Sequence, residues 1–276
     1  MSFRACLALL LPFSCLVASA AERPPAFELR DGDRVAFLGD GLIEGEQYHG
    51  WVEVMLTTRF ADRAVSFRNL GWNGDTPAGE SRFGRSLLQA GKEPPDEGWN
   101  QLVRQIEEAR PTVVFVGYGM ASSFDSAAGL EKFKTDYGRV LDAIAQTSPG
   151  ARLVLLSPIP HENLGAPWPD GVSHNAQLGL YARAIGEIAA ERQAIFVSLF
   201  DRLQARAFGL RGSEGAALSE PSAGGANAAA TKRSPSNPAN RNVAPLTHNG
   251  IHPTGAGYRV IAEVLEEALF TSAGGW

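Results

Sequence analysis

Hydrophobic residues follow two alternating patterns along this chain of 276 residues. Short continuous apolar runs, rich in Val, Leu and Phe, alternate with longer segments in which apolar residues recur every three or four positions. The first pattern is typical of buried strands, and the second of helices that present one apolar face. The expected strands are Arg34–Leu38, Val65–Asn69, Thr112–Val116, Arg152–Leu156 and Ala194–Ser198.

The helical periodicity occupies the segments between and after these strands. It is carried by apolar residues within five segments, which run from Val52 to Phe60, Leu102 to Ile106, Leu130 to Ile144, Leu178 to Ala189 and Val260 to Leu265. Strands that alternate with helices indicate crossover connections on a parallel sheet. Because the strands are apolar throughout, we expect helices to cover both faces of the sheet. The pattern therefore predicts an α/β fold, a doubly wound α/β/α sandwich of three layers.

The first twenty residues have the pattern of a signal peptide. Arg4 is followed by an apolar run from Ala5 to Val17 and then by the small residues Ala18-Ser19-Ala20. A charged start, a short hydrophobic core and a small-x-small cleavage site are typical of secretory signals. We therefore predict a signal peptide over residues 1–20 and export of the chain to the periplasm or the extracellular space, with an uncleaved anchor as the alternative.

Composition restricts the mature chain further. Both cysteines, Cys6 and Cys15, lie in the signal peptide, so no disulfide is expected after export. The 25 Lys and Arg residues are outnumbered by 30 Asp and Glu and form no run, so nucleic acid is not an expected partner. No later apolar run approaches the roughly 20 residues of a membrane span, so none is expected in the mature chain.

We expect residues 21–276 to form a single domain, because this length suits one α/β domain. One segment within it, from Arg211 to Arg241, is dominated by Ser, Gly, Ala, Asn and Pro. Such a composition buries too little apolar surface to offset the entropy of ordering. The segment is therefore predicted to be a disordered surface insertion.

Residues with catalytic potential follow the carboxyl ends of the expected strands. They include Gly39-Asp40-Gly41 after the first strand, Gly71 and Asn73 after the second, and Gly119 and Ala121 after the third. A last group, HNGIH, ends at His252 before the closing helix. Doubly wound sheets bind ligands at this edge, although each glycine alone can equally serve a turn.

The order and spacing of these groups resemble the SGNH/GDSL hydrolases. That family carries Gly-Asp-Ser after the first strand, a glycine after the second, Gly-x-Asn after the third and Asp-x-x-His before the final helix. The corresponding stretches here are Gly39-Asp40-Gly41, Asn69-Leu70-Gly71, Gly119-Met120-Ala121 and Asn249-Gly250-Ile251-His252. The resemblance covers nearly the whole mature chain apart from the insertion. It implies a five-stranded parallel sheet in the flavodoxin-like order 2-1-3-4-5.

The resemblance also implies a role for each position, and three of the polar groups are absent. Gly41 stands at the nucleophile position, Ala121 at the asparagine position and Asn249 at the acid position, whereas His252 retains the base. In this mechanism the serine attacks an ester while the histidine takes its proton and the aspartate orients the imidazole. Without the serine hydroxyl, no acyl-enzyme can form at this position.

Part of the oxyanion hole that the resemblance implies survives, because backbone amides do not depend on the side chain. The amides of Gly41 and Gly71 are the expected donors, and the side chain of Asn73 is a possible substitute for the donor missing at Ala121. The resemblance assigns Asp40 chiefly to the turn, where its carboxylate accepts backbone N–H groups.

Two other sources of catalysis remain open in the sequence. Thr76, Ser122 and Ser123 are hydroxyls near the site, although we expect each to bond to local backbone. His248 and His252 lie four residues apart, and a carboxylate of Asp40, Glu44 or Glu46 could complete a metal site with them. Our expectation is nevertheless that the protein uses no metal or other cofactor.

The function predicted from the sequence is therefore that of an exported SGNH-type acylhydrolase with impaired or altered catalysis, for which a small ester or an acylated carbohydrate is a possible ligand. One alternative is a pseudoenzyme that binds a ligand or carbohydrate without catalysis. The other is a hydrolase in which a metal or His252 activates water.

Overall fold

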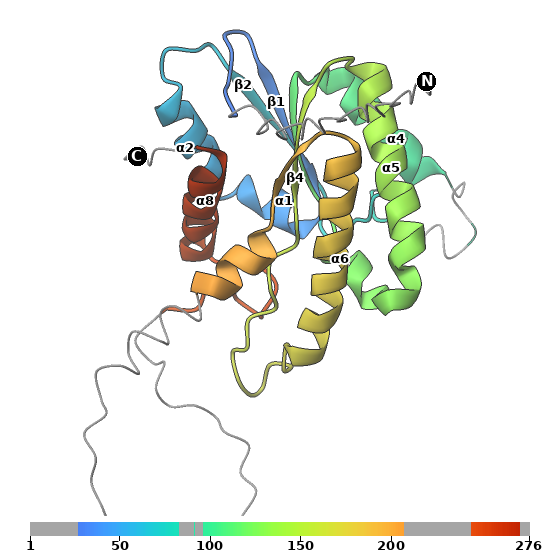
Figure 1. Ribbon diagram of the computed structural model, residues 1–276, viewed down its shortest axis with the longest axis vertical. Coiled ribbons are helices and arrows are strands. Elements are labelled where there is room, and N and C mark those ends of the chain that lie inside the picture. The colour runs from blue at the N-terminus through green and yellow to red at the C-terminus, as the bar shows by residue number, and fades with distance from the viewer. Residues whose placement is uncertain (1–26, 83–90, 92–95, 207–243, 271–276) are drawn as a thin grey trace, which may run out of the picture.

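The computed structural model describes residues 27–82, 91, 96–206 and 244–270, so the predicted signal peptide and insertion lie outside the described residues. A parallel sheet of five strands forms the centre of the fold, in the order β2-β1-β3-β4-β5 (Figure 1). Both the α/β fold and the strand order are confirmed. The strands are β1 Arg34–Gly39, β2 Ser66–Gly71, β3 Val113–Gly117, β4 Arg152–Leu156 and β5 Ile195–Val197.

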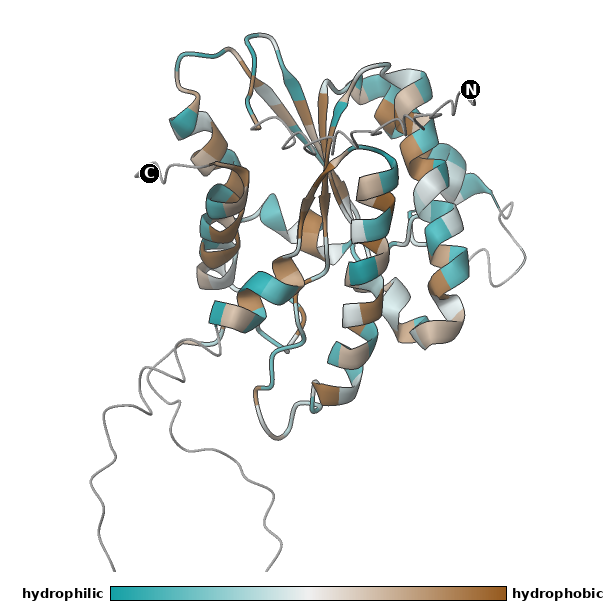
Figure 2. Ribbon diagram, in the orientation of Figure 1, coloured by the Kyte–Doolittle hydropathy of each residue, from teal (hydrophilic) through white to brown (hydrophobic). Residues whose placement is uncertain are grey.

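Helices cover both faces of the sheet, as the apolar strands predict. On one face lie α2 (Trp51–Arg59) and α8 (Gly255–Leu269), whereas α4 (Glu97–Ala109), α5 (Leu130–Thr147) and α6 (Val172–Glu191) lie on the other (Figure 1). Along β1 the side chains alternate between these two layers, with Phe37 in the first and Leu38 in the second. The apolar stripes of the helices accordingly coincide with their sheet-facing sides (Figure 2).

Two short elements after the strands escaped the sequence analysis. Helix α1 (Gly41–Glu46) begins directly after Asp40, and a 3₁₀ segment, η1 (Ser122–Gly129), follows β3. Six residues are too few to show a helical period, so α1 could not be recognised from its apolar pattern. A further helix covers residues 199–206 after β5. Among the described residues, no helix is both long and apolar enough to cross a membrane.

Three glycines form a row at the carboxyl edge of the sheet, where Gly39 pairs with Gly71 on one side and Gly117 on the other. A Cβ atom placed on Gly71 would lie 2.2 Å from the amide nitrogen of Glu44, in α1. A Cβ atom on Gly39 would lie 2.1 Å from the carbonyl oxygen of Gly117. Any side chain there would clash, so the glycines let α1 lie directly on the sheet edge.

Glu46, at the end of α1, is a buried carboxyl group that caps a neighbouring helix. Its Oε1 accepts a hydrogen bond of 2.6 Å from the amide of Val52 at the start of α2. Its Oε2 has no hydrogen-bond partner among the described residues. Burial raises the pKa of Glu46 to about 7 from an ordinary value of 4.5. The folded protein therefore holds this proton at a pH where the unfolded chain has lost it.

This shift predicts that the protein loses stability as pH rises. A carboxyl group whose pKa is raised by folding contributes fully below its unfolded pKa, and the contribution is lost as pH rises through the folded pKa. At 1.36 kcal/mol per pKa unit, Glu46 accounts for a loss of about 3 kcal/mol in unfolding free energy between pH 4.5 and 8. Glu46→Gln should remove that part of the pH dependence. Urea unfolding at several pH values measures the unfolding free energy of the unmodified protein and of Glu46→Gln. If the two free energies changed with pH in parallel, the prediction would be contradicted.

Candidate functional site

The structure brings the nucleophile position and the retained base together at the carboxyl edge of the sheet. Gly41 is the first residue of α1, and His252 lies in the loop that precedes α8. A Cβ atom placed on Gly41 would lie 3.6 Å from Nε2 of His252. A serine at this position would therefore stand beside the imidazole, as nucleophilic catalysis requires. The structure thus brings these two positions together at the edge of the sheet, and we call this place the Gly41–His252 cleft.

Asn249 orients His252 and determines which ring nitrogen carries the proton. Its Oδ1 accepts hydrogen bonds from the amides of Ile251 (3.3 Å) and His252 (3.0 Å) and lies 3.1 Å from Nδ1 of His252. An atom that accepts from two N–H groups is the amide oxygen, so Nδ1 of the neutral ring must donate to it. The lone pair of Nε2 then faces Gly41. The asparagine preserves the orientation of the base but supplies no negative charge.

The side chain of Asn73 occupies the space of the missing nucleophile. Its Oδ1 lies 2.6 Å from the Cβ position of Gly41 and 3.4 Å from Nε2 of His252. At this distance the carboxamide of Asn73 and the imidazole of His252 are in contact, with the roles of donor and acceptor set by the tautomer of the ring and the orientation of the amide. The carboxamide of Asn73 is therefore engaged with the base. The sequence had suggested it instead as a substitute oxyanion donor.

A tight turn after β2 holds Asn73 in this place. The amide of Asp75 donates to the carbonyl of Trp72 at 3.1 Å, and Gly74 has a φ of 70° at the third position of the turn. A positive φ at that position suits glycine. Asn73, at the second position, is thereby held beside His252.

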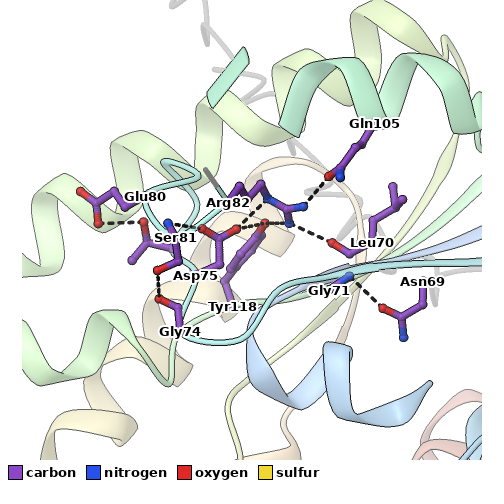
Figure 3. A network of polar contacts seen from close by, with 11 residues as sticks. Asn69, Leu70, Gly71, Gly74, Asp75, Glu80, Ser81, Arg82, Gln105 and Tyr118 are labelled. Atoms are coloured by element: carbon purple, nitrogen blue, oxygen red, sulfur yellow. Dashed lines mark hydrogen bonds and ion pairs between the residues drawn. The ribbon is translucent and has the colours of Figure 1, made fainter. Parts of the chain in front are cut away.

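Beneath this turn lies a buried ion pair that the sequence analysis did not identify. Nε of Arg82 lies 2.8 Å from Oδ2 of Asp75, and both side chains are fully buried (Figure 3). The guanidinium also donates to the Leu70 carbonyl, to Gln105 and to the hydroxyl of Tyr118. This network fixes the Asn73 turn to the end of β2. No sequence signal pairs a turn aspartate with an arginine seven residues later.

Asp40 connects the cleft to the loop after β3. As the N-cap of α1 it accepts from the amide of Leu42 at 3.2 Å, and it also accepts from the amides of Gly119 (3.1 Å) and Met120 (3.0 Å). Burial raises the pKa of Asp40 to about 6, although the amide hydrogen bonds favour the charged form. Its oxygens are thus engaged with backbone rather than directed at a ligand.

The other positions expected to stabilise an oxyanion, Gly71 and Ala121, provide no free hydrogen-bond donor in this structure. The Gly71 amide already donates to Oδ1 of Asn69 at 2.8 Å, so it is not free to meet an oxyanion in this structure, unlike the expectation from the sequence. Ala121 immediately precedes η1 and has no donor in its side chain. Because β3 ends at Gly117, the spacing Gly-x-Asn also fits Gly117-Tyr118-Gly119, and Gly119 has no side-chain amide either.

The acidic side chains considered for a metal site are engaged elsewhere. Glu44 accepts from the hydroxyl of Tyr48 at 3.2 Å, Glu46 caps α2, and Asp40 binds backbone amides. Within the described ranges, no group of three His, Cys, Asp or Glu side chains is placed to hold a metal ion. Of the other histidines, His49 stacks on Tyr258 with ring centroids 4.9 Å apart.

A profile of the GDSL-like Lipase/Acylhydrolase family matches residues 37–260. Among solved structures, the chain is similar to a gut microbial diltiazem-metabolizing enzyme, with a TM-score of 0.58 and 18% identity. That match covers 88% of this chain and 48% of the other, so the chain spans about half the length of that enzyme.

Two further solved structures match over almost their full length. One is an acetylxylan esterase from Geobacillus stearothermophilus, with a TM-score of 0.55, 15% identity and coverage of 89% of this chain and 98% of the other. The second is an alpha/beta hydrolase enzyme from the metagenome of Lake Arreo, Spain, with a TM-score of 0.51, 16% identity and coverage of 87% and 96%. No curated protein sequence matches the chain. At these identities the structural matches establish a shared fold.

Proposed function

The chain belongs to the GDSL-like Lipase/Acylhydrolase family, and we propose that it is an exported member whose Gly41–His252 cleft binds an acylated ligand without forming an acyl-enzyme. One observation carries the proposal. The position of the nucleophile is occupied by the Asn73 carboxamide, whose Oδ1 lies 2.6 Å from the Cβ position of Gly41 and 3.4 Å from Nε2 of His252. A side chain at residue 41 would clash with this amide, because a Cβ atom 2.6 Å from Oδ1 is closer than atoms in contact allow.

The electrostatics of the base support the same proposal. In a serine hydrolase, the imidazole becomes positively charged when it takes the proton, and a carboxylate stabilises that charge. Here Nδ1 of His252 faces the neutral oxygen of Asn249. A triad Asp-to-Asn change lowers turnover about 10⁴-fold, so a water molecule activated by His252 would react slowly.

Exposed aromatic residues around the cleft suggest the class of ligand. Those of the described part, Tyr48, Trp72, Phe124 and Trp168, each follow a different one of the first four strands. We take them as candidate ligand contacts, because ligands of such sheets bind beyond the carboxyl ends of the strands. An aromatic ring offers a flat apolar surface against which a sugar ring or an acyl group can pack. Together with the similarity to an acetylxylan esterase, this favours an acetylated carbohydrate or small ester as ligand.

Export is proposed from the sequence of residues 1–20, since the family and the fold carry no information on location. The mature protein should begin near residue 21. Sequencing the N-terminus of the protein from its native cell fractions tests this, and an intact N-terminus in the soluble fraction would contradict it.

Calorimetric titration of the mature protein with acetylated and deacetylated xylo-oligosaccharides tests the proposed function. The acetylated ligands should bind more tightly, and Trp72→Ala should weaken binding about fivefold, the effect of losing a ring contact of about 1 kcal/mol. Val54→Ala is the matched control, because Val54 is an apolar residue exposed on α2. If Trp72→Ala and Val54→Ala bound the acetylated ligand with equal affinity, the proposed ligand class would be contradicted. Release of acetate that depends on His252 would contradict the absence of catalysis at the cleft.

A further inference from the structure

A chain of three polar side chains lies outside the Gly41–His252 cleft. Oγ of Ser123 lies 2.8 Å from Nε2 of His174, and Nδ1 of His174 lies 3.0 Å from Nδ1 of His161. Ser123 belongs to η1 after β3, His161 to the loop after β4, and His174 to the first turn of α6. These three segments meet at the carboxyl edge of the sheet. The sequence had named Ser123 as a possible relocated nucleophile but had given it no partner.

The surrounding contacts fix the two histidines. The amide of His161 donates to Oδ1 of Asn175 at 2.7 Å, and Nδ2 of Asn175 donates back to the carbonyl of His161 at 2.9 Å. Phe124 stacks on the ring of His174, with centroids 4.3 Å apart. The His161 loop and the first turn of α6 are thereby held in register, which keeps both imidazole rings in line with Ser123.

The two imidazoles share one proton between their Nδ1 atoms, since only one of two facing nitrogens can carry hydrogen. When His174 carries it, its Nε2 presents a lone pair to the hydroxyl of Ser123. Burial, together with the neighbouring His161, lowers the pKa of His174 to about 4. At neutral pH this imidazole is therefore uncharged. The hydroxyl of Ser123 has a second acceptor in the carbonyl of Met120, at 2.7 Å.

We propose that Ser123 and His174 form a nucleophile–base pair for acyl transfer from small esters, with His161 as a positioning residue. A hydroxyl and a base within hydrogen-bond reach, with the base oriented by a third group, is the general arrangement of covalent acyl transfer. The proposal goes beyond the function proposed for the Gly41–His252 cleft, because its nucleophile and base are Ser123 and His174 rather than groups at Gly41 and His252; Phe124 is named in both.

In the first step, Oγ of Ser123 bonds to the ester carbonyl carbon while its proton passes to Nε2 of His174. The tetrahedral intermediate collapses, the bond to the alkoxy oxygen breaks, and His174 returns the proton so that the alcohol leaves. Water then attacks the acyl-serine, again giving its proton to His174. Collapse of the second intermediate releases the carboxylic acid and restores the Ser123 hydroxyl.

The geometry also sets limits on the rate. Ser123 is only 1% exposed, whereas Phe124 is 61% exposed and covers the adjacent ring of His174. Because Ser123 is buried and Phe124 stacks on the base, we expect a substrate to reach the hydroxyl only when Phe124 moves. Among the residues that the structure describes, no carboxylate bonds to His174 to stabilise its protonated form, so turnover should be slow and confined to small acyl groups.

Labelling of the mature protein with a small alkyl fluorophosphonate, followed by peptide mass spectrometry, tests the pair. We expect an adduct on Ser123 that is absent in Ser123→Ala and retained in Ser122→Ala. Ser122 is the matched control, since it is an adjacent buried hydroxyl. His174→Gln should slow labelling at least tenfold, and Phe124→Ala should accelerate it.

A pH profile separates a positioning role of His161 from a merely structural one. The labelling rate should fall in acid as His174 becomes protonated. Because His161 helps to lower the pKa of His174, His161→Phe should move the midpoint of that profile to higher pH. An unchanged midpoint would overturn the role of His161.

The inference is overturned if neither the unmodified protein nor Phe124→Ala gives an adduct on Ser123, or if His174→Gln labels as fast as the unmodified protein. Neither result affects the function proposed for the Gly41–His252 cleft. That proposal fails on a different result, namely ester hydrolysis that depends on His252.

Discussion

Ester hydrolysis should rise on the order of 10³-fold when the missing groups are restored together, as Gly41→Ser, Ala121→Asn and Asn249→Asp in combination with Asn73→Ala. The roughly 10⁴-fold effect of the orienting carboxylate and the roughly 10²–10³-fold effect of one oxyanion donor set an upper limit on the order of 10⁶–10⁷-fold, and we expect only about 10³-fold because grafted groups fit imperfectly. The imidazole already stands 3.6 Å from the Cβ position of Gly41, so the base needs no movement.

The fourth substitution follows from the structure. A Cβ atom on Gly41 would lie 2.6 Å from Oδ1 of Asn73, closer than atoms in contact allow, and the amide would compete for Nε2 of His252. For the oxyanion donor, Ala121 is the suitable position because its φ is −63°, whereas the φ of 132° at Gly119 disfavours asparagine.

The control for restoration is the variant that carries Ala121→Asn, Asn249→Asp and Asn73→Ala but keeps Gly41. It should show no gain, because members of a catalytic triad act as a unit. Rates are measured with a p-nitrophenyl acyl ester on variants whose circular dichroism shows the native fold. A folded fourfold variant with the rate of the unmodified protein would show that the cleft does not hold a triad geometry.

The second large effect concerns stability and the buried Asp75–Arg82 pair. Replacing one partner leaves an uncompensated charge in the interior, which costs about 3–5 kcal/mol. Arg82→Met should therefore lower the unfolding free energy by that amount and the melting temperature by about 10 °C in a chain of this size. It should also release the turn that holds Asn73, because the same guanidinium bonds to the Leu70 carbonyl and to Tyr118.

Lys132→Met is the control for this prediction, because Lys132 pairs with Asp136 and Glu80 at the surface and its side chain is 61% exposed. Exposed pairs contribute about 1 kcal/mol or less. The double variant Asp75→Leu with Arg82→Met should recover part of the stability lost by Arg82→Met, since neither charge then remains. Urea unfolding measures the unfolding free energy of Arg82→Met, of Lys132→Met and of the double variant. A loss below about 1 kcal/mol for Arg82→Met would show that the interior tolerates the Asp75 charge.

The layers and strand order of this fold follow from features that repeat along the chain. Strand β3 is a continuous apolar run and β1, β4 and β5 are largely apolar, whereas β2 contains Ser66, Arg68 and Asn69. Helices α5 and α8 carry long stripes of apolar residues, so many positions indicate the same helix. The observed strand bounds lie within two residues of the predicted ones. Helix α1 was missed because it has only six residues.

The site was less accessible to sequence reasoning, because its features depend on side-chain contacts between distant segments. The motif order identified Gly41, Asn249 and His252, but nothing in the sequence places the amide of Asn73 against an imidazole 179 residues away. Gly71 was read as an amide donor, whereas its small size is needed for the close approach of α1. The contact of Ser123 with His174 joins η1 to α6 over 51 residues of sequence, and hydrophobic periodicity does not reveal such a contact.

The most direct test of the central claim is the turnover number for a p-nitrophenyl acyl ester at saturating concentration, measured in the unmodified mature protein and in His252→Ala. If Asn73 holds the place of the nucleophile and His252 is not a working base, the two proteins should hydrolyse the ester at rates within about twofold of each other. A tenfold or larger loss of turnover in His252→Ala would show that the imidazole activates a nucleophile in this cleft, and would contradict the account.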